Sequence, residues 1–263
     1  MKNILVTGAT GGMGYATCKL LKEKGYNVFA LDISEEPAIP DVFYLKTNLR
    51  NSEEISKAFN IISREISALD AIIHMAGIYD LNSLVEMPEE DFTRIFDVNI
   101  FSVYRINKTF LPLLKKDGKI IITSSELAPL DPLPFTGIYG ITKTALEKYA
   151  FSLRTELSLI GISVAVIRPG AVKTNLLDIS TTAMDKFIGV TKLYKCNAQN
   201  FEKIVNSVEA KNIPPERIAH LVCKILNKTQ PKFVYNLNRN PLLRVLNTLP
   251  AGMQAWIIKK ILD

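Results

Sequence analysis

Residues 4–14 read ILVTGATGGMG, a short apolar run that ends in a glycine-rich turn. From Tyr15 to Lys24 the apolar side chains then follow at helical spacing. A strand, a glycine-rich turn and a helix in this order let the backbone approach a pyrophosphate, while the helix N-terminus offers free N–H groups. Such a turn also serves simply to pack a helix on a strand, so other signals must decide between the two interpretations.

Six more short apolar runs follow along the chain, separated by longer stretches with helical spacing. They cover residues 27–31, 42–45, 71–73, 119–122, 162–167 and 233–235. Strands that alternate with helices need crossover connections, which give a parallel sheet covered on both faces. We therefore predict an α/β fold: a single-domain Rossmann fold with a doubly wound parallel sheet of about seven strands. The longest helices are expected at residues 88–114 and 137–160.

The chain divides into a nucleotide-binding domain at residues 1–238 and an amphipathic C-terminal tail at residues 239–263. Within the domain, residues 173–212 mix polar and apolar side chains irregularly, which is typical of a segment that closes over a ligand. We call this segment the lid. The tail carries apolar residues with basic ones around them, so it fits an interfacial membrane helix. We favour packing on the substrate opening or on a partner subunit.

The composition excludes several classes of protein. Of the 263 residues, 48% are hydrophobic and 22% charged, enough to bury a full core. The net charge of +6 comes from scattered lysines and arginines, so we expect no nucleic-acid partner. The three cysteines lie far apart, and we expect no metal site, no disulfide framework and a cytoplasmic location. No apolar run is long enough for a signal peptide or a membrane span.

Three further groups of residues suggest hydride chemistry. Asp32 ends the second strand, where a carboxylate accepts the hydroxyls of an adenosine ribose and repels a 2′-phosphate, which favours NAD over NADP. Tyr139 and Lys143 lie at positions i and i+4 of a predicted helix, and a nearby cation lowers the pKa of a phenol. Ser124 and Ser125 end the fifth strand, where a hydroxyl would hydrogen-bond a carbonyl oxygen. A tyrosine and a lysine at this spacing can also occur by chance on the surface of a helix. The presence of all these groups in this order along the chain favours the functional interpretation.

Taken together, these motifs resemble the short-chain dehydrogenase/reductase family, in its shorter branch. Its T-G-x-x-x-G-x-G pattern matches Thr7, Gly8, Gly12 and Gly14, and its Y-x-x-x-K pair matches Tyr139 and Lys143. Four further family positions match less distinctive residues, at Ala76-Gly77, Asn99, Ser125 and Pro169-Gly170. The resemblance covers the chain up to about residue 237.

The resemblance implies an oxidoreductase that interconverts an alcohol and a ketone or aldehyde by hydride transfer with NAD(P). Tyr139 would be the general acid and base, Ser125 would polarise the substrate oxygen, Lys143 would lower the tyrosine pKa, and Asn99 would hold a water. These four are the expected catalytic residues. The expected cofactor-binding residues are Gly8, Ala9, Thr10, Gly12, Met13, Gly14, Asp32, Asn48, Leu49, Ala76, Gly77, Tyr139, Lys143, Pro169, Gly170, Val172 and Thr174.

Some positions depart from the family pattern. His74 and Met75 replace two asparagines, and we expect His74 to be structural. If the loop after the fifth strand is aligned differently, Ser124 replaces Ser125. Gly8, Gly11 and Gly14 also fit the family's extended branch of sugar-nucleotide epimerases and dehydratases, which remains an alternative. A cofactor-binding regulator without turnover is a second one.

The lid and the loop after the fifth strand carry many apolar residues. They include Leu127, Leu130, Leu133, Phe135, Leu176, Leu177, Ile179, Met184, Phe187, Ile188 and Leu193. If half of them line the pocket, the substrate is bulky and apolar, as for a hydroxysteroid or retinol dehydrogenase. If they pack within the lid, the pattern says nothing of the substrate. The family resemblance also implies a homodimer or homotetramer built on the helices that carry Asn99 and Tyr139.

Overall fold

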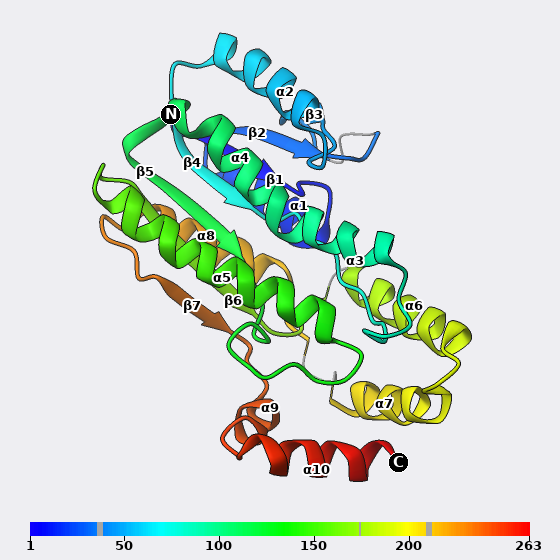
Figure 1. Cartoon of the computed structure of the whole chain (residues 1–263). Helices are drawn as coiled ribbons and strands as arrows, with labels where there is room; N and C mark the ends of the chain where they lie inside the picture. Colours follow the sequence, from blue (N-terminus) through cyan, green and yellow to red (C-terminus); the bar gives the residue numbers. More distant parts are fainter. Residues whose placement is uncertain (36–38, 174, 209–211) are drawn as a thin grey trace.

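The structure, a computed structural model, describes residues 1–35, 39–173, 175–208 and 212–263, and side chains within these ranges except at 175–181 and 206–208. Its centre is a seven-stranded sheet in the order β3-β2-β1-β4-β5-β6-β7 (Figure 1). All neighbouring strands pair in parallel, so the predicted fold class is confirmed. The strands are β1 (Asn3–Thr7), β2 (Asn27–Asp32), β3 (Phe43–Lys46), β4 (Leu69–His74), β5 (Leu114–Thr123), β6 (Ser163–Pro169) and β7 (Val234–Leu237).

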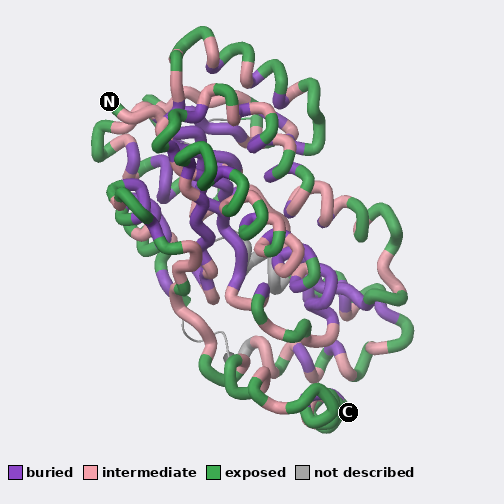
Figure 2. The backbone as a smooth tube through the Cα atoms, turned by 60° about the vertical axis from the view of Figure 1, so that its left-hand side comes forward, coloured by how far each residue is buried: buried purple, intermediate pink, exposed green. Residues whose placement is uncertain are grey.

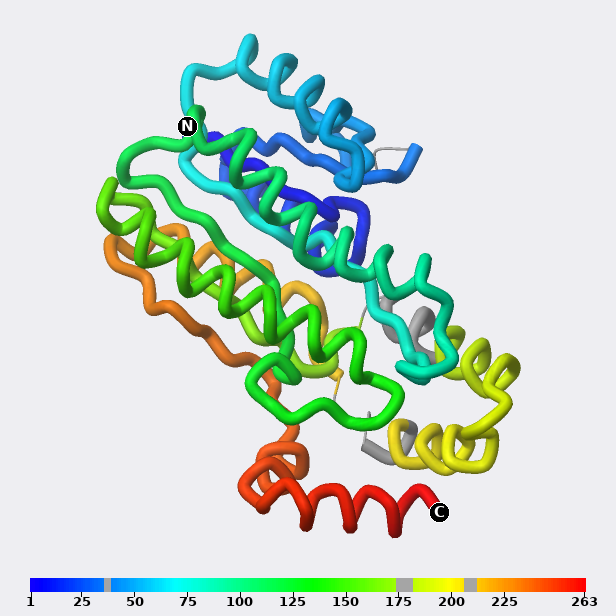
Figure 3. Tube along the Cα trace, viewed as in Figure 1, coloured from blue at the N-terminus to red at the C-terminus, as the bar shows by residue number. Residues whose placement is uncertain are grey.

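Helices cover both faces of the sheet, as the backbone trace shows (Figure 3). On one face, α1 (Gly12–Glu23) packs beside α8 (Glu216–Leu226). On the other face lie α2 (Ser52–Glu65), α4 (Ser102–Phe110) and α5 (Gly137–Ser158). This two-sided cover explains why the central strands are apolar throughout instead of alternating with polar residues.

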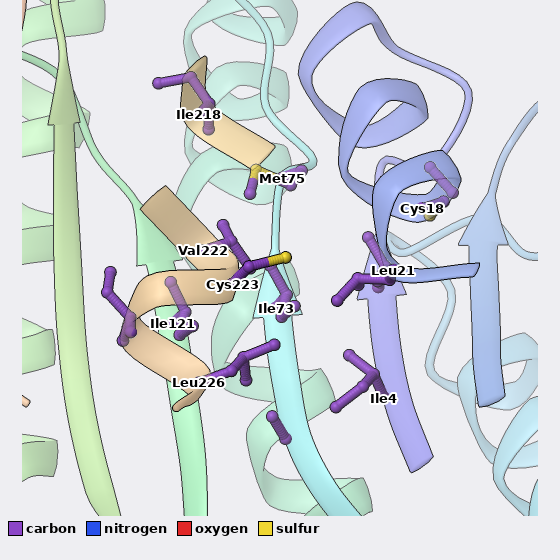
Figure 4. Packing of buried hydrophobic residues seen from close by; sticks show 14 of the residues in the cluster. Ile4, Cys18, Leu21, Ile73, Met75, Ile121, Ile218, Val222, Cys223 and Leu226 are labelled. Atoms are coloured by element: carbon purple, nitrogen blue, oxygen red, sulfur yellow. The ribbon is translucent and has the colours of Figure 1, made fainter. Parts of the chain in front are cut away.

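Neighbouring side chains along each central strand enter different cores. In β1, Ile4 and Val6 join the cluster under α1 and α8, while Leu5 joins the cluster under α2, α4 and α5. Figure 4 shows the first cluster, where Leu21 of α1 and Val222 of α8 meet the strand residues. The buried sheet forms the centre of the molecule and exposed helix faces form its outside (Figure 2).

The strand order reverses direction between β1 and β4, which are neighbours in the sheet. From β1 the chain runs outward to β2 and β3, then returns to β4 and continues to β7 on the other side. The loops that follow β1 and β4 therefore leave in opposite directions and open a crevice at the carboxyl ends of the strands. Ligands of doubly wound sheets bind at such a point.

The helix predicted for residues 88–114 is confirmed in extent, at residues 89–113, but it is not one regular α-helix. It consists of α3 (Glu89–Phe96), a π-helical turn (Asp97–Phe101), α4 and a short 3-10 turn (Leu111–Leu113). The apolar spacing of the sequence does not register the extra residue of a π-turn, because the side chains on either side of it still face the core. Pro112 then ends the helical stretch.

The lid and the tail form a third layer beyond the carboxyl edge of the sheet. The lid contains α6 (Asn175–Val190) and α7 (Lys195–Val208), and the tail contains α9 (Pro241–Leu246) and α10 (Ala251–Leu262). α10 packs on α7 (Figure 1), and Leu262 joins the apolar cluster of the lid. Among the described residues, no helix is long and apolar enough to cross a membrane.

Candidate active site

The glycine-rich turn after β1 brings three backbone segments into contact. Gly8 has a φ of +69°, which favours glycine, and a Cβ there would lie 2.4 Å from the backbone nitrogen of Ala76. A Cβ on Gly14 would lie 1.9 Å from the carbonyl oxygen of Gly8. The N-terminus of α1, the end of β1 and the loop after β4 therefore meet with no space for side chains. A cofactor can approach the backbone directly at such a place.

Gly11 differs from these two glycines. A Cβ at Gly11 would lie 3.5 Å from the carbonyl oxygen of Gly8, which is ordinary van der Waals contact. Its φ and ψ of −69° and 155° are open to any residue. The tight packing thus requires Gly8 and Gly14 but not Gly11, the glycine that the extended-branch pattern would need. Gly12 begins α1, and Met13 lies in its first turn.

Asp32 connects the end of β2 to this turn. Its carboxylate accepts hydrogen bonds from the backbone N–H groups of Thr10 (3.0 Å) and Ser34 (3.2 Å). Asp32 therefore lies beside the glycine-rich turn, where the sequence predicts it. No lysine or arginine forms an ion pair with Asp32 among the described residues.

Asn48 and Leu49 follow β3, the strand next to β2, at the same carboxyl edge of the sheet as Asp32. The backbone of Thr47 pairs with the carbonyl of Asp32 (2.6 Å), which continues the alignment of β2 and β3. The side chain of Asn48 accepts from the backbone N–H of Arg50 (3.0 Å), and Leu49 is buried in the core under α2. In this structure the Asn48 amide thus stabilises its own turn.

Asn99 lies in the π-turn between α3 and α4 and is buried. Its amide exchanges two hydrogen bonds with the backbone of Ile78, with Oδ1 accepting from the N–H (2.9 Å) and Nδ2 donating to the carbonyl (3.0 Å). Nδ2 also donates to Thr142 Oγ1 on α5 (3.1 Å). The π-turn, a feature often found at functional sites, thus connects α3 and α4 to the loop after β4 and to α5.

Ser125 and Tyr139 meet at the end of β5. Burial raises the pKa of Tyr139 to about 12, and its interaction with the Ser125 side chain opposes this increase in part. Ser125 Oγ also accepts from the backbone N–H of Leu127 (3.2 Å). Ser124 is buried too, but its hydroxyl has no hydrogen-bond partner among the described residues. Of the two serines, Ser125 is the one beside Tyr139.

Lys143 lies one turn further along α5 and is buried. Its ammonium donates to the carbonyl of Thr123 (3.2 Å) and lies 5.6 Å from the centre of the Tyr139 ring. A Cβ on Gly77 would contact both Lys143 Nζ (3.5 Å) and Asn99 Oδ1 (3.4 Å), so these three residues meet.

Burial affects both members of the predicted tyrosine–lysine pair. It raises the pKa of Tyr139 to about 12 and lowers the pKa of Lys143 to about 8, against a partial increase from the charge of Glu147. The expectation that the ammonium lowers the phenol pKa stays a prediction.

His74 and Met75 hold the end of β4 by contacts of their own. His74 Nε2 lies 2.8 Å from Asn107 Oδ1, and Asn107 in turn donates to the hydroxyl of Tyr149 (3.1 Å). Thr123 donates to the Met75 sulfur (2.9 Å). The two residues that depart from the family pattern thus still connect β4 to β5, α4 and α5. Burial lowers the His74 pKa to about 4.

The loop after β6 closes the other side of the crevice. A Cβ on Gly170 would lie 1.8 Å from the carbonyl oxygen of Asn238, and the carbonyl of Pro169 accepts from the N–H of Glu126 (2.8 Å). Val172 is buried and forms an isolated bridge with Ile213. Thr174, predicted to contact the cofactor, lies outside the described residues.

Two residues that the sequence analysis did not single out belong to the site. The Tyr79 ring packs edge-on against the Tyr139 ring, with centroids 4.8 Å apart. Thr142 connects Asn99 to the Tyr139 carbonyl, to which its hydroxyl donates (2.8 Å). Tyr79 lies two residues after Gly77, and Thr142 directly precedes Lys143. Their positions next to these motifs were the only sequence feature that could have indicated a role in the site.

This geometry can be compared with known proteins. The model of the family described as short chain dehydrogenase matches residues 2–185, more than half of the chain. The chain belongs to the short-chain dehydrogenase family. A short-chain dehydrogenase from Streptomyces avermitilis has the same fold, with a TM-score of 0.78, 20% identity and coverage of 100% of this chain and 99% of that one.

Two relatives of this short-chain dehydrogenase carry names of specific reactions. A 3-ketodihydrosphingosine reductase of Bacteroides thetaiotaomicron is 28% identical over 263 residues, 97% of this chain and 96% of the relative. An estradiol 17-beta-dehydrogenase 2 of Mus musculus is 31% identical over 187 residues, 66% of this chain. The match covers 49% of the length of the mouse protein.

As a member of this family, the short-chain dehydrogenase is an NAD(P)-dependent oxidoreductase. The described residues fit the cofactor, because the cradle of Gly8 and Gly14 leaves the N–H groups at the start of α1 open to a pyrophosphate. When bound there, the nicotinamide supplies or accepts the hydride.

Proposed function

We propose that this enzyme reduces an apolar, lipid-like ketone to a secondary alcohol, and catalyses the reverse oxidation at higher pH. Tyr139 is the general acid and base, and Ser125 holds and polarises the substrate oxygen. The single observation that carries the proposal is the close approach of Ser125 and Tyr139 at the carboxyl end of β5, beside the switch point of the sheet.

The pKa of Tyr139 supports reduction as the direction at neutral pH. With a pKa raised to about 12, the phenol is protonated at neutrality and is ready to donate to a carbonyl oxygen. Alcohol oxidation needs the phenolate instead, whose fraction rises tenfold with each pH unit below the pKa. Rates of oxidation should therefore increase with pH, while rates of reduction should not.

Lys143 and Asn99 are proposed to position this pair. Lys143, held by the Thr123 carbonyl, directs its charge toward the space between Gly77 and Tyr139 and would hold the ribose of the cofactor. Asn99 fixes Ile78 and Thr142, and through them the loop and the helix on which the reacting groups lie. Precise placement of this kind contributes much of the rate of an enzyme.

The apolar substrate class rests on the relatives more than on the lid. Phe135, Met184 and Phe187 are buried within the lid cluster, where the rings of Phe135 and Phe187 lie 4.7 Å apart. These side chains support the lid itself, Leu193 is exposed, and Leu176, Leu177 and Ile179 lie outside the described side chains. The names of the relatives, a sphingoid-base reductase and an estradiol dehydrogenase, favour a lipid-like substrate.

For the cofactor we propose a preference for NAD over NADP, on the strength of Asp32. A carboxylate beside the glycine-rich turn repels a 2′-phosphate, and it accepts hydrogen bonds from ribose hydroxyls. The variant Asp32→Ser should lower kcat/KM with NADH and raise it with NADPH, changing their ratio about tenfold or more. An unchanged ratio would contradict the assignment of Asp32.

Steady-state oxidation of NADH with a panel of carbonyl compounds tests the proposed reaction. The panel contains steroid ketones, long-chain 3-ketones and retinal, with small polar ketones and sugar nucleotides as comparisons. We expect turnover with apolar members. Turnover with sugar nucleotides alone would indicate the extended-branch alternative, and cofactor binding without any turnover would indicate a regulator.

We also propose a homodimer through the helices that carry Asn99 and Tyr139. Their outer faces expose large apolar side chains, including Phe101 and Tyr104 near and on α4 and Phe151 on α5. Burial of such a patch favours association. Light scattering of Phe151→Asp against the unaltered chain would test this, with loss of the dimer expected.

A further inference from the structure

The strongest feature outside the site is the exposed surface of the tail. Five of its large apolar side chains are more than half exposed, although one side of α10 is packed. They are Leu242, Val245, Met253, Trp256 and Ile261. Met253 and Trp256 lie on the side of α10 opposite the packed one, whereas Ile261, seven residues after Gln254, lies at the edge of the packed side. Apolar exposure of this kind marks an interaction surface.

The inner face of α10 is firmly held. Gln254 is buried and donates to Asp131 Oδ2 (3.0 Å) and to the carbonyl of Leu249 (2.9 Å). The carbonyl of Leu262 accepts from Asn197 on α7 (2.8 Å), and Leu262 itself is buried in the lid cluster. Gln254 and Leu262 are eight residues apart and share one side of the helix. This side faces the lid and the loop after β5, so the opposite side is directed outward.

The outward side combines apolar and basic residues. Met253, Trp256 and Lys260 follow at helical spacing of three and four residues, opposite Gln254 and Leu262. Lys259 lies beside them, and both lysines are exposed. The C-terminal helix is accordingly mostly exposed in Figure 2.

The charge of the tail is mainly basic. From residue 239 to residue 263 the sequence contains four basic side chains, Arg239, Arg244, Lys259 and Lys260, and one acidic one, Asp263 at its last position. Arg239 is half-buried beside Glu126, which leaves Arg244, Lys259 and Lys260 as the exposed basic groups. An apolar surface with an excess of basic groups complements the anionic headgroups and the acyl chains of a bilayer. A second copy of the same face fits less well, because a twofold contact would bring the lysines of the two copies together with only one carboxylate side chain from each tail.

We propose that α9 and α10 dock on the surface of an anionic lipid bilayer and lie in its plane. The 12 residues of α10 span about 18 Å, too short to cross a hydrocarbon core of about 30 Å. Because α10 packs on α7 (Figure 1), docking brings the lid close to the membrane. This proposal goes beyond the proposed reaction and does not depend on it.

Trp256 provides a direct probe, because it is the single tryptophan of the chain and is 64% exposed. Full-length protein is mixed with vesicles of phosphatidylcholine and phosphatidylglycerol, or of phosphatidylcholine alone. On the anionic vesicles we expect co-sedimentation, a blue shift of the tryptophan emission and quenching by brominated acyl chains. High salt should weaken the binding.

Two variants and a matched control separate the contributions. Lys259→Glu/Lys260→Glu should weaken partitioning to anionic vesicles about tenfold or more. In the presence of these vesicles, the tryptophan emission of this variant should stay at the wavelength of the vesicle-free protein. Met253→Ser should reduce the depth of quenching. The control Lys57→Glu/Lys148→Glu alters two exposed lysines on α2 and α5 and should bind as the unaltered chain does.

The outcomes that overturn the proposal are equally distinct. No co-sedimentation and no spectral shift on anionic vesicles would exclude a membrane surface. A blue shift that depends on protein concentration without vesicles, together with a larger mass in light scattering, would mean that a second copy covers this face. Equal vesicle binding by the charge-reversed and control variants would show that the lysines of the tail do not cause the binding. None of these readouts requires turnover, so failure of the proposed reaction would leave them interpretable.

Discussion

The two walls of the active site are built in different ways. The inner wall, at the carboxyl edge of the sheet, is held by backbone contacts and buried polar bonds: Gly8 against Ala76, Asn99 on Ile78 and Lys143 on Thr123. The outer wall, made of lid and tail, is held by an apolar cluster and a few polar contacts such as that of Gln254 with Asp131.

This difference suggests that catalysis and substrate specificity depend on different parts of the molecule. The inner wall tolerates few changes, because backbone atoms meet with no free space at Gly8 and Gly14 and most of its buried polar groups have specific partners. An apolar cluster is less directional and accepts side chains of similar volume. We infer that the inner wall fixes the reaction and that the outer wall is free to vary with the substrate.

The largest effect is expected from Tyr139→Phe at the inner wall. Removal of the phenol hydroxyl eliminates the proton donor, and kcat should fall about 10³-fold. The dissociation constant for NADH, measured by fluorescence titration, should stay nearly unchanged, since the ring remains. Tyr26→Phe, just before β2 and so at the opposite end of the strands from the site, serves as the control. Retention of turnover by Tyr139→Phe would remove this residue from the mechanism.

A second prediction separates two neighbouring glycines. Gly14→Ala should destabilise the fold by about 3 kcal/mol and weaken cofactor binding, because its Cβ would meet the Gly8 carbonyl. Gly11→Ala should cost less than about 1 kcal/mol, since the site has room. Urea unfolding of both variants measures the difference. Equal losses would show that the turn does not pack as described.

The third prediction concerns the pH dependence of stability. From pH 6.5 down to about 4 the unfolded chain binds a proton at His74 and the folded chain does not. The free energy of unfolding should therefore fall as the pH is lowered through this window, by about 3 kcal/mol in all.

Urea unfolding at several pH values measures this dependence. His74→Gln should flatten it, while the exposed His220→Gln should keep the slope of the unaltered chain. If both variants keep that slope, the buried histidine does not titrate as its surroundings imply.

The smallest effect is expected at the outer wall. Gln254→Ala removes two hydrogen bonds of the tail and should cost about 1 kcal/mol. Hydrogen exchange should accelerate in α10 and leave β4 and β5 unaffected. Gln199→Ala, at an exposed position of α7, is the matched control. Faster exchange throughout the sheet would mean that the stability of the inner wall depends on that of the outer wall.

Much of the inner wall could be predicted from the sequence, because its motifs are local. The glycine-rich turn directly follows a strand, and Tyr139 and Lys143 are one helical turn apart. Contacts between distant segments were not predictable: Tyr79 on Tyr139, Thr142 between Asn99 and Tyr139, and the π-turn that turns Asn99 toward them. Hydrophobic spacing records which side of a helix faces the core, but it does not record an extra residue in one turn.

The sequence by itself determined the alternation of strands and helices, the parallel sheet and the order of the reactive residues, because periodicity and short motifs are encoded within a few positions. Only the tertiary structure decided which serine meets Tyr139, how burial sets the pKa values of Tyr139 and Lys143, and which side of the tail is left exposed. These properties depend on what surrounds a group in space, and the surroundings come from segments far apart in the chain.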